Sequence, residues 1–332
     1  MRRPLAITLL LLAAAPLSIL IALAAGSVSL SLDQLWTALA SDAPGVARTV
    51  VLELRLPRAL AALAVGGMLG LAGALLQVLL RNPLADPYVL GISGGAAVGA
   101  LLAIALGAAG VLVGGAAFAG AIASMLLVFG LARAGGAWTQ SRLLLTGVVL
   151  AAGWGACVSL LLAISPAMQV QGMVFWLLGD LGYAREPAAG LVVLVSGLAL
   201  AMLYARPLNL LARGERVAAA LGERPAHLRV LVYFLASLLS AVAVTLAGSI
   251  GFVGLVVPHL LRLLGLTDHR WLLPNTVLLG GALLVIADAL ARTVLAPVQL
   301  PVGVLTALIG VPAFLYLLAR ATDPGHRTHG TP

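Results

Sequence analysis

The stretch from Arg206 to Arg229 reads RPLNLLARGERVAAALGERPAHLR and interrupts an otherwise apolar sequence. It holds five of the 19 basic residues of the 332-residue chain, and long apolar runs flank it on both sides. Charged side chains are costly inside a bilayer, so the stretch must lie outside one. A membrane helix does not need such a charged, helix-prone insert for itself. The stretch therefore predicts a docking surface for a soluble partner on one side of a membrane.

The composition predicts a polytopic, all-α membrane protein. Hydrophobic residues make up 62% of the chain and charged residues 9%, with a mean hydropathy of +1.14, whereas soluble domains carry about 25% charged residues. A bilayer core takes about 20 apolar residues as helix, which satisfies the backbone internally. We expect residues 1–332 to form a single transmembrane domain of about ten helices, in which 206–227 is the longest inner loop. The predicted spans are 5–25, 58–80, 91–109, 111–132, 143–165, 188–205, 228–247, 248–265, 272–295 and 302–319.

Two of these spans have an alternative or irregular form. The first also resembles a signal peptide, since Arg2 and Arg3 precede it, but its apolar run is longer than a usual signal sequence. The segment 248–265 has a short apolar part interrupted by Pro258, which predicts a broken or partial span.

The distribution of arginine predicts the orientation in the membrane. All basic residues are arginines, and a net charge of +8 would suggest nucleic acid in a soluble protein. Here the bias of arginine toward cytoplasmic loops explains it. With both termini in the cytoplasm, fourteen arginines lie inside and five outside. This predicts a multi-pass protein of the inner, cytoplasmic membrane. The five outer arginines are Arg48, Arg55, Arg58, Arg185 and Arg292.

Several kinds of site are missing from the sequence. The one cysteine, Cys157, permits no internal disulfide, and we expect it to be a small buried hydrophobe. A phosphate-binding G-x-x-x-x-G-K-[S/T] loop is impossible without lysine. No His, Cys and carboxylate cluster indicates a metal, and no nucleophile–base pair indicates an enzyme. His259 is best explained as a packing residue. If the protein uses ATP, another chain must hydrolyse it.

Six strings together resemble the permease family of binding-protein-dependent importers for iron–siderophores, haem and vitamin B12. The resemblance implies a type II ABC importer permease fold of ten helices. It also implies that two copies of the chain form a homodimer with the transport pathway between them. It further implies two separate ATPase chains inside, which hold ATP and magnesium, and a periplasmic substrate-binding protein outside. GLTDHR and SRLLL resemble the vitamin B12 members most, but iron-chelate members carry close variants. The strings are RLPRALAALAVGGMLGLAGALLQ (55–77), NPLADPYVLGISGGAAVGA (82–100), SRLLLTGV (141–148), ARGERVAAALG (212–222), GSIGFVGLVVPHLLRLLGLTDHR (248–270) and LPVGVLTALIGVPAFLYLL (300–318).

By this resemblance, residues 212–222 form the cytoplasmic coupling helices that enter a cleft of the ATPase. Two glycines bracket a short helix, an acidic residue near its start suits the helix dipole, and three alanines give it a small, smooth surface. An ordinary arginine-rich inner loop is the alternative. The predicted coupling residues are Arg213, Gly214, Glu215, Ala218, Leu221 and Gly222.

Three arginines lie on the predicted outer side, although arginine is usually more frequent in cytoplasmic loops, so their position requires an explanation. By resemblance, Arg55, Arg58 and Arg292 dock the binding protein through carboxylates on its two lobes. An Arg–carboxylate pair is planar and bidentate, so it sets orientation as well as affinity. Arginines that reach toward lipid headgroups are the alternative.

A gate at the inner end of the pathway is also implied by the resemblance. Asn82, Pro83 and Leu84 follow the second span, while Gln140 and Ser141 precede the fifth. The vitamin B12 members of the family have small hydroxyl residues at the second of these places, and Gln140 departs from that pattern. A simple helix stop at Asn82-Pro83 is the alternative. The fifth and tenth spans are expected to line the pathway.

Small residues in the third span predict close helix packing. Gly91, Gly95 and Gly99 are spaced four residues apart, and small residues at that spacing let membrane helices approach closely.

An acid inside the ninth span raises a function of another class. Asp288 lies four residues before Arg292, so the two can pair on one helix face. A proton-coupled secondary transporter would need such an acid. The coupling string and the lack of a second intramembrane acid favour the ABC permease.

Overall fold

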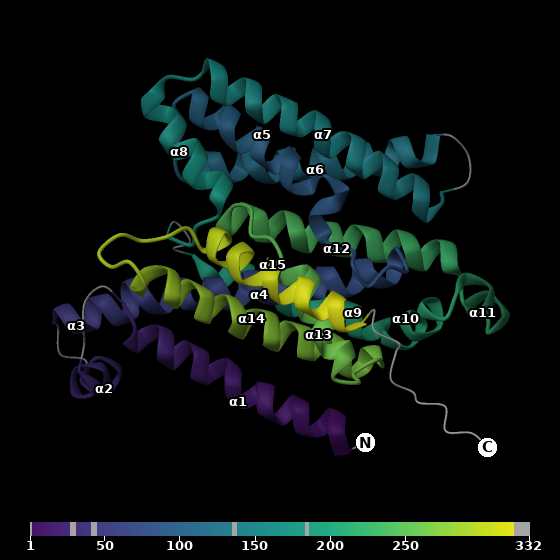
Figure 1. Cartoon of the computed structure of the whole chain (residues 1–332), viewed down its shortest axis with the longest axis horizontal. Helices are drawn as coiled ribbons and strands as arrows, with labels where there is room; N and C mark the ends of the chain where they lie inside the picture. Colours follow the sequence, from purple (N-terminus) through teal and green to yellow (C-terminus); the bar gives the residue numbers. More distant parts are fainter. Residues whose placement is uncertain (1, 27–30, 41–44, 135–137, 183–185, 322–332) are drawn as a thin grey trace.

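The computed structural model describes residues 2–26, 31–40, 45–134, 138–182 and 186–321, and within these ranges it is helical without β-strands (Figure 1). The α-helices are α1 (Arg2–Ala24), α2 (Leu32–Ala40), α3 (Val46–Arg48), α4 (Leu56–Leu79), α5 (Ile92–Ala105), α6 (Val111–Ala134), α7 (Gln140–Ile164), α8 (Ala167–Leu178), α9 (Pro187–Leu203), α10 (Ala205–Ala212), α11 (Glu215–Ala220), α12 (Pro225–Ala247), α13 (Val253–Leu263), α14 (His269–Thr293) and α15 (Val302–Ala321). A π-helix, η1 (Thr49–Arg55), and a 3-10 helix, η2 (Pro87–Leu90), complete them.

The all-helical membrane fold is confirmed, but the predicted number of ten spans is not. Among the described residues, six helical segments are long and apolar enough to cross a bilayer: α1, the run from α3 to α4, α6, α7, α12 and α14. Helices α9 and α10 make a seventh only as a pair bent by 64°. The predicted spans at α5, α13 and α15 appear as shorter apolar helices. The segment predicted as a broken or partial span is the short helix α13, which begins only at Val253, but Pro258, which was expected to interrupt it, lies inside that helix.

Two predicted outer loops contain helix. The second span was expected at 58–80, yet one helical run extends over 34 residues from Val46 to Leu79. Arg55 and Arg58 had suggested the membrane boundary, but partners inside the protein satisfy both side chains, so they do not end the helix. The expected loop 166–187 contains α8, an apolar helix of 12 residues.

Helix α4 is the centre of the bundle. It packs against α9, α12, α13 and α14, and α1 covers the outer side of α14 (Figure 1). The most apolar window of the α3–α4 run is 89% buried. A Cβ added to Gly66 would lie within 3 Å of the Gly280 carbonyl oxygen. Glycine is required there because the α4 and α14 backbones touch.

The packing predicted for the third span is confirmed. In α5, a Cβ on Gly95 would overlap Gly120 of α6, and one on Gly99 would overlap Ala116. Helices α5 to α8 form a group beside α12 (Figure 1).

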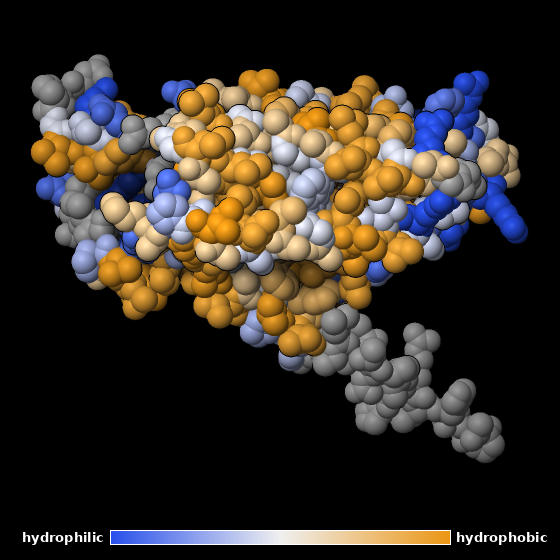
Figure 2. Space-filling model, turned by 90° about the horizontal axis from the view of Figure 1, so that it is seen from above, coloured by the Kyte–Doolittle hydropathy of each residue, from blue (hydrophilic) through white to orange (hydrophobic). Residues whose placement is uncertain are grey.

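Helix α7 is the least covered of the long helices. Only 6% of its apolar window is buried, because it contacts α5, α6 and η2 along one edge. Cys157 lies on this helix and is exposed, so the prediction that it is buried was wrong. Figure 2 shows a broad hydrophobic belt between two hydrophilic ends, as a bilayer-spanning protein requires.

Candidate functional site

The charged stretch forms two short helices at one end of the bundle. Gly214 joins α10 to α11 with φ of +121°, and Gly222 follows α11 with φ of +87°. These positive values favour glycine. The first residue of α11, Glu215, pairs with Arg229 of α12 at 3.0 Å. Figure 2 shows the densest hydrophilic surface at the end where α11 lies in Figure 1, which we call the coupling end.

The outward surface of the coupling end differs in part from the prediction. Arg213 and Gly222 are exposed, and Leu221 is 62% exposed. Ala218 is fully buried, so its expected place on an outward alanine surface was wrong. A helix buries one face, and Ala218 lies on that face of α11. Val217 is 41% exposed and takes part in the outward surface instead.

A small hollow of about 410 Å³ opens between α11 and the end of α4. Three arginines surround it, together with the start of α11. The hollow can therefore receive an acidic or hydrogen-bonding group from a partner. Its lining residues are Arg81, Arg213, Gly214, Glu215, Arg216 and Val217.

An amide side chain ties α10 to the start of α14, a link that the sequence analysis missed. The Asn209 amide donates to Asp268 Oδ1 at 2.8 Å, and its oxygen accepts from the His269 backbone N–H at 2.9 Å. Asp268 caps α14 by accepting from the Arg270 N–H at 3.0 Å. The Arg270 guanidinium holds the pKa of Asp268 well below its usual range. A Ser/Thr/Asp/Asn before an apolar run signals a helix start, so DHR in GLTDHR could have indicated the cap.

The structure brings the two predicted halves of the gate together at the coupling end. Gln140 begins α7 and donates from Nε2 to the Leu79 carbonyl of α4 at 2.9 Å. Asn82 follows α4, and its side chain accepts from the Leu84 N–H at 2.9 Å. Leu84 and Ser141 are exposed. Gln140 therefore has a structural contact to α4, and the role of these four residues as a gate stays a prediction.

Beside Asn82, a partly buried acid caps η2, and Tyr88 of η2 contacts the segment before α13. Asp86 accepts from the Tyr88 N–H at 2.8 Å and caps η2. Burial raises the pKa of Asp86 to about 6, although this hydrogen bond opposes the shift. The Tyr88 hydroxyl accepts from the Ile250 N–H at 3.3 Å. The sequence analysis did not single out either residue.

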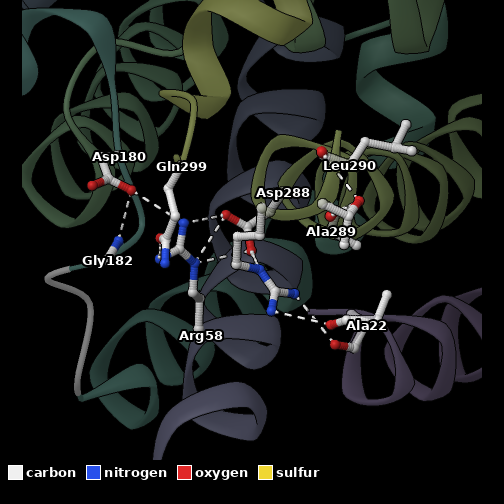
Figure 3. Close-up of polar contacts among 11 residues, drawn as sticks. Ala22, Arg58, Asp180, Gly182, Asp288, Ala289, Leu290 and Gln299 are labelled. Atoms are coloured by element: carbon white, nitrogen blue, oxygen red, sulfur yellow. Dashed lines mark hydrogen bonds and ion pairs between the residues drawn. The ribbon is translucent and has the colours of Figure 1, made fainter. Parts of the chain in front are cut away.

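An ion cluster, drawn in Figure 3, lies at the opposite end of the bundle, where α4 begins and α14 ends. Asp288 of α14 is 1% exposed and accepts from Arg58 at 2.8–3.0 Å and from Arg292 at 3.0 Å. Arg58 also pairs with Asp180, after α8, at 3.2 Å, and contacts Gln299. The predicted pairing of Asp288 with Arg292 is confirmed. The cluster joins α4, α14 and the segments that follow α8 and precede α15.

The three arginines predicted to dock a binding protein do not all project from the surface. Arg292 is 6% exposed, and its guanidinium donates to the Ala22 and Ala25 carbonyls. Arg55 is 5% exposed and donates to the Leu23 carbonyl at 2.7 Å. Both bind the open carbonyls at the end of α1. Arg58 keeps a partly exposed side chain. Of the other outer arginines, Arg185 is outside the described residues.

The part of the chain that the structure describes has no group of three or more His, Cys, Asp or Glu side chains that could hold a metal ion. The ring of His259 packs edge-on against Phe314, with 5.8 Å between ring centroids.

A family model covers almost the whole chain. Residues 11–320 match the model of the FecCD transport family. The chain belongs to the FecCD transport family. The relatives of this chain include a cobalamin import permease, BtuC, of Halobacterium salinarum, which is 44% identical over 83% of this chain and 74% of its own length. The hemin transport permease HmuU of Yersinia pestis is 41% identical over 90% of each chain. A vitamin B12 import permease of Salmonella paratyphi A is 40% identical over 91% and 93%.

A solved structure agrees with this family. A metal-chelate type ABC transporter in an inward-facing conformation superposes with a TM-score of 0.83 and 34% identity, over 96% of this chain and 99% of the other. PsaBC of Streptococcus pneumoniae has a TM-score of 0.56 at 18% identity, which shows a shared fold alone. The expected family and its permease fold are thus confirmed, and this FecCD chain is a membrane-spanning transport permease of the type II ABC importer class.

Proposed function

We propose that this chain is the permease subunit of a binding-protein-dependent importer, driven by ATP that separate ATPase chains hydrolyse. The two-helix unit α10–α11 carries the proposal. It is exposed, basic and held at one end of an apolar bundle by the Glu215–Arg229 pair and by Asn209. A rigid, exposed unit of this kind suits the transfer of movement from a soluble partner. The coupling end then faces the cytoplasm, and two ATPases dock on two permease copies.

The uncovered apolar surfaces support a homodimer with the pathway between the copies. Helix α7 is hardly buried, and α15 exposes Leu308, Ile309 and Leu315 by 53–66%. These are the fifth and tenth predicted spans, the expected lining of the pathway. Contiguous apolar surface of this kind fits either lipid or a second copy.

The substrate that we propose is a bulky metal chelate: vitamin B12, haem or a ferric siderophore. Relatives named for cobalamin and for hemin are 44% and 41% identical to this chain, so identity does not separate the two. We expect most of the discrimination among chelates to come from the binding protein.

A proton-coupled carrier based on Asp288 is the competing function. A carrier acid must be free to take up and release protons, whereas Asp288 is buried and both of its carboxylate oxygens accept hydrogen bonds from Arg58 or Arg292. This arrangement favours a structural role for Asp288 over the role of a proton carrier.

Transport into vesicles tests the driving force. With the ATPase and binding protein reconstituted, uptake of labelled cobalamin, haem or ferric siderophore should require ATP on the ATPase side and should persist when a protonophore collapses the proton gradient. Asp288→Asn should retain part of the uptake in the fraction that folds. Loss of uptake on adding a protonophore at constant ATP would favour the secondary carrier.

We further propose that the binding protein docks at the end that carries the ion cluster, with Arg58 as the partly exposed contact. Arg58→Gln leaves Arg292 to neutralise Asp288, so the protein should still fold. An exposed ion pair contributes about 0.2–1 kcal/mol, so the affinity for the binding protein should fall up to about fivefold, and less at high salt. Arg142→Gln, at the coupling end, serves as the control. Equal affinities for both variants would contradict docking through Arg58.

A further inference from the structure

An apolar groove of about 960 Å³ opens at the coupling end between α6, α9 and α12. Its walls include Phe129 of α6, Leu200 of α9, and Phe234 and Leu238 of α12. Leu200 and Leu238 are 39% and 41% exposed, so the groove is open along the side of the bundle. The groove is separate from the ion cluster, and it meets the coupling segment through Arg229, which pairs with Glu215.

Basic and hydrogen-bonding side chains lie at one end of this groove. Arg133, at the end of α6, is exposed and stands 5.9 Å from the Phe129 ring centroid. His227, in the first turn of α12, is also exposed, and Arg229 lies beside it with its guanidinium 5.4 Å from the Trp138 ring centroid. All of these residues line the groove.

Two N–H donors in the groove wall have no hydrogen-bond acceptor among the residues that the structure describes. These are the Trp138 indole Nε1 and the Arg229 Nε, and both atoms are buried. Arg229 uses Nη1 for the Trp138 carbonyl and Glu215, both within about 3.1 Å, which leaves its Nε unpaired. Buried donors without partners are costly and uncommon in folded proteins. An anion at Arg133 and His227 would place its negative charge against the wall that holds both donors.

The groove is long enough to have a charged end and a separate apolar part. Arg229 and Leu238 are nine residues apart on α12, which is about 13 Å along a helix. That length is nearly half of a bilayer core of about 30 Å. A ligand that fits both parts therefore has an anionic head and a long apolar tail.

We propose that this groove binds an anionic phospholipid, with its phosphate at Arg133, His227 and Arg229 and an acyl chain along Phe129, Leu200 and Leu238. Basic pockets between membrane helices are suited to anionic headgroups. If the coupling end faces the cytoplasm, as the proposed function has it, this lipid belongs to the cytoplasmic leaflet, and only this assignment rests on the proposed function. Because Arg229 also pairs with Glu215, the bound lipid lies next to the coupling helices.

Quenching of Trp138 fluorescence measures this binding directly. The purified full chain in neutral detergent is titrated with brominated phosphatidylglycerol or with brominated phosphatidylcholine, and the signal is the difference between wild type and Trp138→Phe. We expect phosphatidylglycerol to bind at least fivefold more tightly. One arginine near an anionic headgroup contributes about 1 kcal/mol, so Arg133→Gln should weaken it about fivefold. His227→Gln should weaken it in the same direction.

Arg206→Gln is the matched control, since Arg206 is exposed at the same end but does not line the groove. It should leave the affinity unchanged, and inorganic phosphate should not compete. Equal affinity for both lipids, an equal loss in Arg206→Gln, competition by free phosphate, or displacement of the lipid by the ATPase would each overturn the proposal. The quenching assay does not measure transport. If the chain does not bind the lipid but still supports ATP-driven uptake, the lipid site is disproved and the proposed function is not.

Discussion

Asp288→Ala is expected to destabilise the folded permease by about 3–5 kcal/mol, the usual effect of leaving buried charges without their partner. The change removes the carboxylate between Arg58 and Arg292, whose side chains are 12% and 7% exposed. Arg58 retains Asp180, but Arg292 keeps only the backbone carbonyls of the α1 end. Thermal and denaturant unfolding of the purified chain in detergent measures the loss.

A double variant tests whether unpaired charge is the cause. Asp288→Leu/Arg292→Leu removes both partners of the buried pair, so it should be more stable than Asp288→Leu alone. Asp33→Ala, which removes an exposed acid from α2, should change the free energy of unfolding by about 0.5 kcal/mol or less. If the losses from the two Leu substitutions simply add, the cluster is not held by its charges.

Gly222→Trp is expected to abolish ATP-driven uptake, because it places an indole ring on the outward surface next to Leu221. Gly222 is exposed, and no neighbouring atom lies within 4 Å of a Cβ added there, so the folded chain has room for the ring. Its φ of +87° adds a backbone strain of about 1–2 kcal/mol. Uptake and ATPase binding of the reconstituted complex are the measurements.

Gly107→Trp separates this strain from the loss of coupling. Gly107 has a φ of +80° and equal space for a Cβ, but it lies in the turn between α5 and α6, away from the coupling segment. Both variants should lose similar thermal stability, and only Gly222→Trp should lose uptake. Full uptake in Gly222→Trp, or equal loss in both variants, would show that α11 is not the coupling surface.

The sequence could predict the helical membrane class and the family because both depend on local features. Apolar runs of about 20 residues mark helices wherever they pack, and strings such as ARGERVAAALG are continuous in the chain. The same reliance on local features led to a wrong prediction of where the α4 span begins. It took Arg55 and Arg58 as a membrane boundary, while tertiary contacts pair both side chains within the bundle.

Which residues face outward could not be deduced in the same way. The coupling segment was found from its charge, yet the position of Ala218 on the buried face depends on how α11 lies against its neighbours. The contact of Gln140 with Leu79 joins residues 61 positions apart, and Asn209 meets Asp268 across 59. No periodicity in one chain indicates such pairs.

The sequence by itself determined that this protein is a helical membrane permease with a charged segment between two apolar runs. Hydrophobicity and helix periodicity are properties of neighbouring residues, so they can be deduced without the fold. Only the tertiary structure decided that Asp288 is enclosed by Arg58 and Arg292, and that α6, α9 and α12 leave an apolar groove with basic residues at one end. Ion pairs and grooves arise where distant segments meet, and helix packing decides which segments these are.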